Sequence, residues 1–212
     1  MAQKSALPLG LTIYTMSLCS LFTSLITVGA FVRIPFPVVP ITLQTLFVVL
    51  AALLLGPKYS FISAGLYLFL GLAGLPIFTK GGGPGYILQP TFGYLLGFLA
   101  AVLVIGFLSK KFRRRLESGS WKGRPGKAAS SFVPVLCYWG IGMIGIAVIY
   151  LIGMAYLSLI MNVYMKTPIG FWSLFTVNFL LTFLGDAFKC FVAALLAVRL
   201  FPILRKSAKF SV

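Results

Sequence analysis

Apolar residues along this chain fall into long blocks, separated by clusters of proline, glycine and basic residues. The blocks do not alternate apolar with polar positions, as the strands of an outer-membrane barrel do. A helix of about 20 apolar residues is long enough to cross the hydrocarbon core of a bilayer. The pattern therefore predicts an all-α polytopic membrane protein, a bundle of six transmembrane helices. The expected helices cover residues 11–32, 41–56, 59–75, 91–109, 131–160 and 171–200.

The composition agrees with this pattern and favours a single membrane domain over residues 1–212. Hydrophobic residues make up 60% of the chain and charged residues only 9%, which leaves too little polar surface to cover a water-soluble globule. Six spans with short connections use nearly the whole length. The first apolar block is too long for the core of a signal peptide, so we expect it to be retained as a helix.

The net charge of +16 would suggest nucleic acid as the partner of a soluble protein, but here the basic residues lie between and after the apolar blocks. With both termini in the cytoplasm, fourteen Lys and Arg residues fall on the inner side and three on the outer side. We therefore interpret the charges as topology signals and expect no nucleic-acid partner. The basic cytoplasmic loop over residues 110–130 has a second interpretation, attraction to anionic lipid or to a cytoplasmic protein.

The residues that metal, redox, ATP-driven and enzymatic chemistry usually require are missing from the sequence. The chain has three cysteines, no CxxC motif and no histidine, so we expect no metal site and no redox cofactor. A Walker A motif, GxxxxGK[ST], is also absent, so any ATP-driven cycle needs another polypeptide. No combination of nucleophile, general base and metal supports a membrane enzyme, and we expect no catalytic residues.

Asp186 and Lys189 are the most informative residues, because they lie deep in the last apolar block. Their three-residue spacing places both side chains on one face of a helix, where they can pair. An ionised residue in the membrane is costly, faces the bundle interior and usually serves function. The carboxylate can accept hydrogen bonds from a polar ligand and the ammonium can donate them. The alternatives are that the two charges only neutralise each other, reach toward the cytoplasmic end, or relay protons or ions.

Two loop segments are further candidates for a ligand site. The glycine-rich segment over residues 74–86 and the residues after it could form a lid on the outer side, or an ordinary flexible connection. Its candidate ligand contacts are Thr79, Lys80, Tyr86 and Gln89. In the proline-rich segment over residues 34–45, Thr42 and Gln44 begin an otherwise apolar helix. Gln44 can form an interhelical hydrogen bond or contact a ligand.

Five segments together resemble the BioY family, the biotin-specific substrate-binding subunits of energy-coupling factor (ECF) vitamin transporters. In chain order they are PVVPITLQ at residues 37–44, LLGP at 54–57, GLAGLPIF at 71–78, PTFGYLLGF at 90–98 and GDAFK at 185–189. Each segment alone is weakly specific. Their order and spacing within six expected spans make the resemblance specific.

The resemblance implies a six-helix substrate-binding component (S-component) in the bacterial cytoplasmic membrane that captures biotin from outside with high affinity. It would associate with a membrane coupling subunit and two cytoplasmic ATPase subunits. Asp186 and Lys189 match the family's D-x-x-K and would bind the polar head of biotin. Phe78 and Tyr94 would enclose its ring and valeryl chain, and the glycine-rich loop would close the site with Thr79, Lys80 or Gly82 near the ligand.

Departures from the family pattern keep other functions open. Gln89 and Phe92 replace glycines that are usual in the family, and the first helix carries small polar residues where an A-x-x-x-A contact surface is common. The alternatives are an S-component for another vitamin, and a solitary ion-coupled or facilitative transporter of a small molecule.

Overall fold

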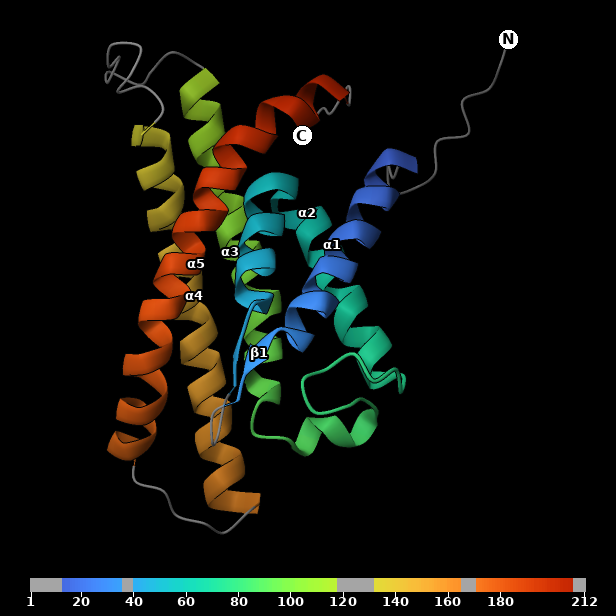
Figure 1. The fold of residues 1–212 in the computed structure, drawn as a ribbon, viewed down its shortest axis with the longest axis vertical. Coiled ribbons are helices and arrows are strands. Elements are labelled where there is room, and N and C mark those ends of the chain that lie inside the picture. Colours follow the sequence, from blue (N-terminus) through green and yellow to red (C-terminus); the bar gives the residue numbers. More distant parts are fainter. Residues whose placement is uncertain (1–12, 36–39, 118–131, 165–170, 208–212) are drawn as a thin grey trace.

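The structure, a computed structural model, describes residues 13–35, 40–117, 132–164 and 171–207. It is mostly helical (Figure 1), with five long helices. All five contain a stretch that is long and apolar enough to cross a membrane, which confirms the expected polytopic helical class. The long helices are α1 (Ile13–Phe31), α2 (Gln44–Leu72), α3 (Phe92–Glu117), α4 (Phe132–Leu159) and α5 (Phe171–Ser207).

Short elements lie near one end of the bundle. Strand β1 (Arg33–Ile34) pairs antiparallel with β2 (Ile41–Thr42), and β2 is followed by α2. A 3₁₀ helix, η1 (Pro84–Leu88), precedes α3, and a π-helical turn, η2 (Ile160–Tyr164), ends α4. The hairpin was not expected from the sequence, because the prolines around it gave no strand pattern.

The spans expected over residues 41–56 and 59–75 correspond to the single element α2, which begins at Gln44, after β2, and ends at Leu72. Helical geometry stops inside it at Gly56, whose φ of 74° and ψ of −178° suit glycine far better than other residues. The following Pro57 disfavours helical geometry at the residue before it. Figure 1 shows the parts of α2 before and after this break running in opposite directions. We call them the first and second limbs of α2.

The other expected spans agree with the helices apart from their ends. Helix α3 continues past residue 109 to Glu117, so part of the basic loop expected over residues 110–130 is helical. Lysine and arginine are good helix formers, and cations at a helix C-terminus are favoured by its dipole. The rest of that expected loop, residues 118–130, lies outside the described residues.

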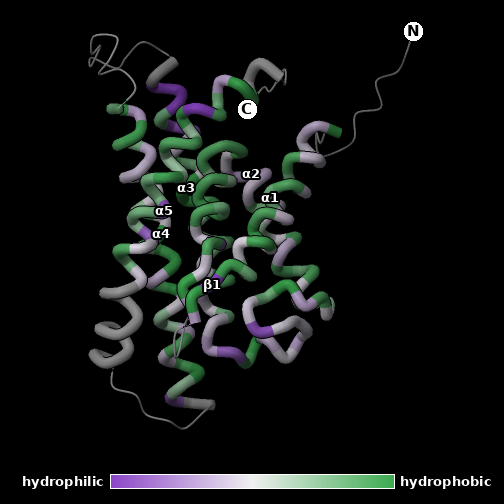
Figure 2. The backbone as a smooth tube through the Cα atoms, viewed as in Figure 1, coloured by the Kyte–Doolittle hydropathy of each residue, from purple (hydrophilic) through white to green (hydrophobic). Residues whose placement is uncertain are grey.

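Small residues let the central helix α3 approach its neighbours closely. A Cβ added to Gly97 would lie 3.0 Å from the backbone of Ile149 in α4, so glycine permits this contact. Figure 2 shows that much of the described backbone carries hydrophobic residues. Large apolar side chains such as Leu151 and Leu184 face outward, with 73% and 76% of their surface exposed, as expected for helices in contact with lipid tails.

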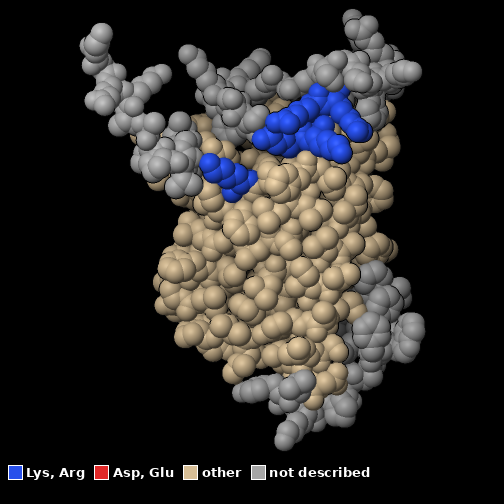
Figure 3. All heavy atoms as spheres, turned by 180° about the vertical axis from the view of Figure 1, so that it is seen from behind, with Lys and Arg blue, Asp and Glu red and all other residues tan. Residues whose placement is uncertain are grey.

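The two ends of the bundle differ in charge. Helices α1 and α4 begin, and α3 and α5 end, at the same end of the molecule (Figure 1). Figure 3 shows a patch of basic side chains at that end. The last turns of α3 contribute Lys110, Lys111, Arg114 and Arg115, which border a shallow hollow there. The opposite end holds the β hairpin and η1.

Candidate functional site

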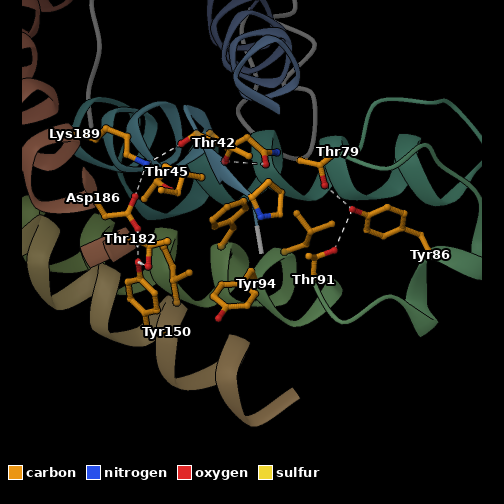
Figure 4. Close-up of a pocket in the computed structure, with 16 residues that line it drawn as sticks. Thr42, Thr45, Thr79, Tyr86, Thr91, Tyr94, Tyr150, Thr182, Asp186 and Lys189 are labelled. Atoms are coloured by element: carbon orange, nitrogen blue, oxygen red, sulfur yellow. Dashed lines mark hydrogen bonds and ion pairs between the residues drawn. The ribbon is translucent and has the colours of Figure 1, made fainter. Parts of the chain in front are cut away.

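A pocket lies between the β hairpin, the first limb of α2, the loop around η1, and helices α3, α4 and α5 (Figure 4). Charged and hydroxyl-bearing side chains occupy parts of its wall. The rest of the wall is largely apolar and includes Pro40, Ile41, Leu95, Phe98 and Ile149. A mostly apolar cavity with a few polar groups is typical of a small-molecule site.

Asp186 and Lys189 form the charged part of the wall. Lys189 Nζ lies 2.5 Å from Asp186 Oδ1, one turn away on α5, and both residues are more than nine-tenths buried. Lys189 also donates a hydrogen bond of 2.8 Å to the backbone carbonyl of Thr42 in β2. The expected pairing is therefore present, and the lysine ties α5 to the hairpin instead of reaching toward the cytoplasmic end.

Tyr150 of α4 positions the carboxylate of Asp186. Its hydroxyl donates a hydrogen bond of 2.6 Å to Asp186 Oδ2 and lies 2.8 Å from the hydroxyl of Thr182. Sequence reasoning missed both residues. Thr182 had a detectable signal, since it precedes Asp186 by one helical turn and shares its face. Tyr150 had none, because the helical phase of α4 cannot be read from a nearly uniform apolar block.

Gln44 belongs to a hydrogen-bond network as well as to the pocket wall. Its amide nitrogen donates to the hydroxyl of Tyr67 at 2.7 Å, and that hydroxyl donates to the carbonyl of Ile77 at 3.3 Å. The hydroxyl of Thr42 lies 3.5 Å from the amide oxygen of Gln44. Gln44 thus forms the interhelical hydrogen bond that was one of its two expected roles, here between the two limbs of α2. It also lines the pocket, where it can contact a ligand.

Three hydroxyl groups form a second polar part of the wall. The hydroxyl of Tyr86 in η1 lies 2.9 Å from that of Thr79 and 3.2 Å from that of Thr91, just before α3. Figure 4 shows this cluster on the side of the drawn pocket away from Asp186 and Lys189. Thr79 and Tyr86 were expected at the site, whereas Thr91, which follows the glycine-rich loop and belongs to a family motif, was not named as a ligand contact.

Tyr94 of α3 lies in the wall as expected. Its ring makes an edge contact with that of Tyr150, with centroids 6.2 Å apart, and packs over Gly153 of α4. Its hydroxyl is buried and has no hydrogen-bond partner within the described part of the chain. A buried hydroxyl without a partner is costly, so this group is available to a ligand or to water.

Phe78, Lys80, Gly82 and Gln89 do not line the pocket. Phe78 is 1% exposed and packs behind the site, its ring centroid 4.5 Å from that of Tyr86. Lys80 and Gly82 are exposed, and Gln89 is half-buried. Their loop is folded back on the end of α2, where Gly83 N donates to the carbonyl of Gly71 at 2.7 Å. Direct ligand contact by these four residues stays a prediction.

The charged part of the wall is suited to a neutral ligand group that both donates and accepts hydrogen bonds. The ion pair carries no net charge, yet its carboxylate can accept from N–H groups and its ammonium can donate to a carbonyl. Among the described residues, no three His, Cys, Asp or Glu side chains come close enough to hold a metal ion.

Comparisons with known proteins agree on one family. The model of the BioY family matches residues 1–206. A probable biotin transporter BioY of Lysinibacillus sphaericus is 39% identical over 89% of this chain and 87% of its own length. The biotin transporter BioY of Thermotoga maritima is 36% identical over 85% of this chain and 91% of its own.

A solved structure is similar over nearly the whole fold. It is the crystal structure, at 2.1 Å, of the S-component for biotin from an ECF-type ABC transporter. The TM-score is 0.69 at 28% sequence identity, and the match covers 92% of this chain and 93% of the other. The arrangement of helices around the pocket is therefore similar to that of a known substrate-binding subunit.

Proposed function

The chain belongs to the BioY family, and we propose from this membership and from the pocket that it captures biotin as the S-component of an ECF-type vitamin transporter. By family it is a transport protein and not an enzyme. The observation that carries the proposal is the buried, neutral pair of Asp186 and Lys189 in the wall of an otherwise largely apolar pocket.

Biotin has the polarity that this wall requires. Its ureido head carries two N–H donors and one carbonyl acceptor, which match the carboxylate of Asp186 and the ammonium of Lys189. Binding would insert the head between the two charges or beside them, with Tyr150 holding the carboxylate in place. The apolar ring and valeryl chain would lie against Tyr94, Leu95 and Phe98.

We place six helices across the bacterial cytoplasmic membrane, with the two limbs of α2 counted separately and both termini in the cytoplasm. The opposite directions of the limbs and the basic patch at the end of α3 support this orientation. It puts the β hairpin, η1 and the pocket beside them toward the outer side, from which biotin would arrive.

The proposed partners are a membrane coupling subunit and two cytoplasmic ATPase subunits. The chain itself carries no Walker A motif, and its structural relative is described as part of an ABC transporter. Uptake by vesicles that contain only this chain would contradict this assignment and favour the solitary transporter.

Equilibrium binding of biotin to the purified protein in detergent tests the proposal, with riboflavin and thiamine as control ligands. We expect saturable binding of biotin alone. Lys189→Ala should lower the affinity at least about 100-fold, because the ureido carbonyl loses a charged donor and Asp186 is left buried without its partner. Lys58→Ala is the matched control, since Lys58 is exposed outside the pocket. Preference for another vitamin would overturn the biotin assignment.

A further inference from the structure

We propose that the C-terminal turns of α3 bind the headgroup of an anionic phospholipid in the cytoplasmic leaflet, an inference that rests on the proposed orientation of the chain. These turns lie at the end of the bundle away from the pocket (Figure 1). Figure 3 shows the basic side chains that gather there. Together with one apolar side chain they border a shallow hollow. The residues that line it are Phe107, Lys110, Lys111, Arg114 and Arg115.

Helical spacing places the apolar and the basic side chains of the hollow on one stripe of α3. Phe107 precedes Lys110 by three residues and Lys111 by four, and Arg114 follows them at the same intervals. Phe107 is 62% exposed and lies on the bilayer side of the lysines, because the apolar part of the helix ends at residue 108. The stripe runs about 10 Å along the helix axis. It passes from apolar to cationic, as a phospholipid passes from acyl chain to phosphate.

Arg113, which lies within the same basic segment, serves the fold instead. It is 7% exposed, contacts the carbonyl of Leu54 and lies over the ring of Phe201. These internal contacts account for its presence in α3. The cations that border the hollow lie on the outside of the helix, where Lys111 and Arg114 are exposed. They are therefore placed to bind something outside the protein.

The hollow carries a net positive charge. Its four basic residues fall within positions 110–115, and like charges three or four residues apart on a helix repel each other. Glu117 is the nearest acidic residue in the sequence and can neutralise at most one of them, since the other acidic residue, Asp186, is paired with Lys189 in the pocket. The helix dipole supplies only about half a negative charge at this end. A bound phosphate group would supply the missing anion.

Phe107 distinguishes a phospholipid from other anions. Free phosphate or a nucleotide would use the charges of the hollow and leave this ring unused. A cytoplasmic protein would approach from the aqueous side, whereas Phe107 lies on the side of the bilayer. An anionic phospholipid uses both parts of the stripe. Its phosphate lies at the level where basic side chains reach the headgroups, and its acyl chain lies against the ring of Phe107.

Titration of the purified protein in detergent with fluorescent phospholipids tests the proposal. Phosphatidylglycerol is the anionic probe, and zwitterionic phosphatidylcholine with the same labelled acyl chains is the control. We expect the wild type to bind phosphatidylglycerol at least about 10-fold more tightly. The double variant Lys110→Gln with Lys111→Gln should lower that affinity about 10-fold and leave that for phosphatidylcholine unchanged. Phe107→Ala should weaken both lipids by the same factor, because both have acyl chains.

The double variant Arg33→Gln with Lys58→Gln is the matched control, since it removes the same charge from exposed residues outside the hollow. It should leave both affinities unchanged. A second measurement needs no variant: added NaCl should weaken the binding of phosphatidylglycerol by the wild type and spare that of phosphatidylcholine.

The proposal is overturned if the wild type binds the two lipids equally, or if the two double variants behave alike. It is also overturned if inorganic phosphate displaces phosphatidylglycerol as well as the unlabelled lipid does, because the hollow would then bind a free anion. Normal lipid binding by Lys110→Gln with Lys111→Gln, together with failure to assemble with the partner subunits, would assign the hollow to a protein instead. None of the lipid titrations uses biotin, so their failure is distinct from failure of the proposed function.

Discussion

Two clusters of buried polar side chains lie inside this apolar bundle, and they differ in what they contact. The site cluster contains Asp186, Lys189, Tyr150 and Thr182 and borders a pocket. The break cluster contains Ser60, Ser109 and Arg113 and lies where the two limbs of α2 meet. Both clusters are more than nine-tenths buried, so burial alone does not separate a site from a structural feature.

The partners of the break cluster are backbone carbonyls. Ser60 donates to the carbonyl of Gly56 at 2.6 Å, and Ser109 to that of Gly106 at 3.0 Å. Arg113 reaches the carbonyl of Leu54 at 3.5 Å and lies over the ring of Phe201, 4.5 Å from its centroid. A break in a helix leaves carbonyls without helical partners, and Arg113 and Ser109 of α3 contact the carbonyls of Leu54 and Ala52 just before the break.

The partners of the site cluster are mainly other side chains that face a cavity. Within the described part of the chain, the Asp186 carboxylate contacts the side chains of Lys189 and Tyr150. Such a carboxylate keeps acceptor capacity for a ligand. The comparison therefore predicts that changes in the site cluster abolish binding, whereas changes in the break cluster lower stability and leave binding intact.

Asp186→Asn should have the largest effect, a loss of biotin affinity of at least about 100-fold, measured by equilibrium binding in detergent. The substitution removes a charged acceptor and leaves Lys189 buried without its counterion. The double variant Asp186→Asn with Lys189→Gln has no buried charge, so it should recover thermal stability without recovering binding. Recovered binding would mean that the two charges serve only to neutralise each other.

Arg113→Ala should have the next largest effect, and on stability instead of affinity. It removes the contact with Leu54 and the packing against Phe201, and we expect the free energy of unfolding to fall by about 2 kcal/mol. Denaturation in detergent measures the fall, and biotin binding by the folded fraction should be unchanged. The neighbouring Arg114→Ala is the control, because Arg114 is exposed. A loss of affinity in Arg113→Ala with unchanged stability would remove the distinction between the clusters.

Tyr150→Phe should lower biotin affinity by about 10-fold, since it deletes the 2.6 Å hydrogen bond to Asp186 while keeping the ring. Tyr156→Phe is a matched control on the same helix, because the hydroxyl of Tyr156 donates to the carbonyl of Ile87 and does not line the pocket. Titration with biotin compares the two variants. Equal affinities would show that Tyr150 does not position the carboxylate that binds the ligand.

The two clusters also show what the sequence could and could not predict. Asp186 and Lys189 stand out because charged residues in an apolar block are rare and expensive. Tyr150 does not stand out, since the direction of its side chain depends on the helical phase of a nearly uniform apolar block. The break at Gly56 followed from the Gly-Pro pair, but the side chains that cap it come from α3, which is distant in sequence.

The expectations for the glycine-rich loop show a second limit. Thr79 and Tyr86 line the pocket, whereas Lys80 and Gly82, one and three residues beyond Thr79, are exposed. Composition left a lid and an ordinary connection equally open, and which side chains of the loop point inward depends on its backbone hydrogen bonds. Phe78 N donates to the carbonyl of Gly81 at 2.9 Å, which forms the tight turn that directs Lys80 outward.

Ser109→Ala should have the smallest effect and gives the most sensitive test of the comparison. The hydroxyl of Ser109 donates to the carbonyl of Gly106 within its own helix at 3.0 Å and lies 3.4 Å from the carbonyl of Ala52. The substitution removes only these two contacts and leaves the helix and its packing in place. We expect a fall of about 0.5 to 1 kcal/mol in the free energy of unfolding and unchanged biotin affinity. Thr182→Ala removes a hydroxyl group from the site cluster and should have the opposite effect. It should lower the affinity for biotin more than it lowers the free energy of unfolding. The same outcome for both variants would show that the clusters differ in position but not in role, because each hydroxyl would then matter only as a buried polar group.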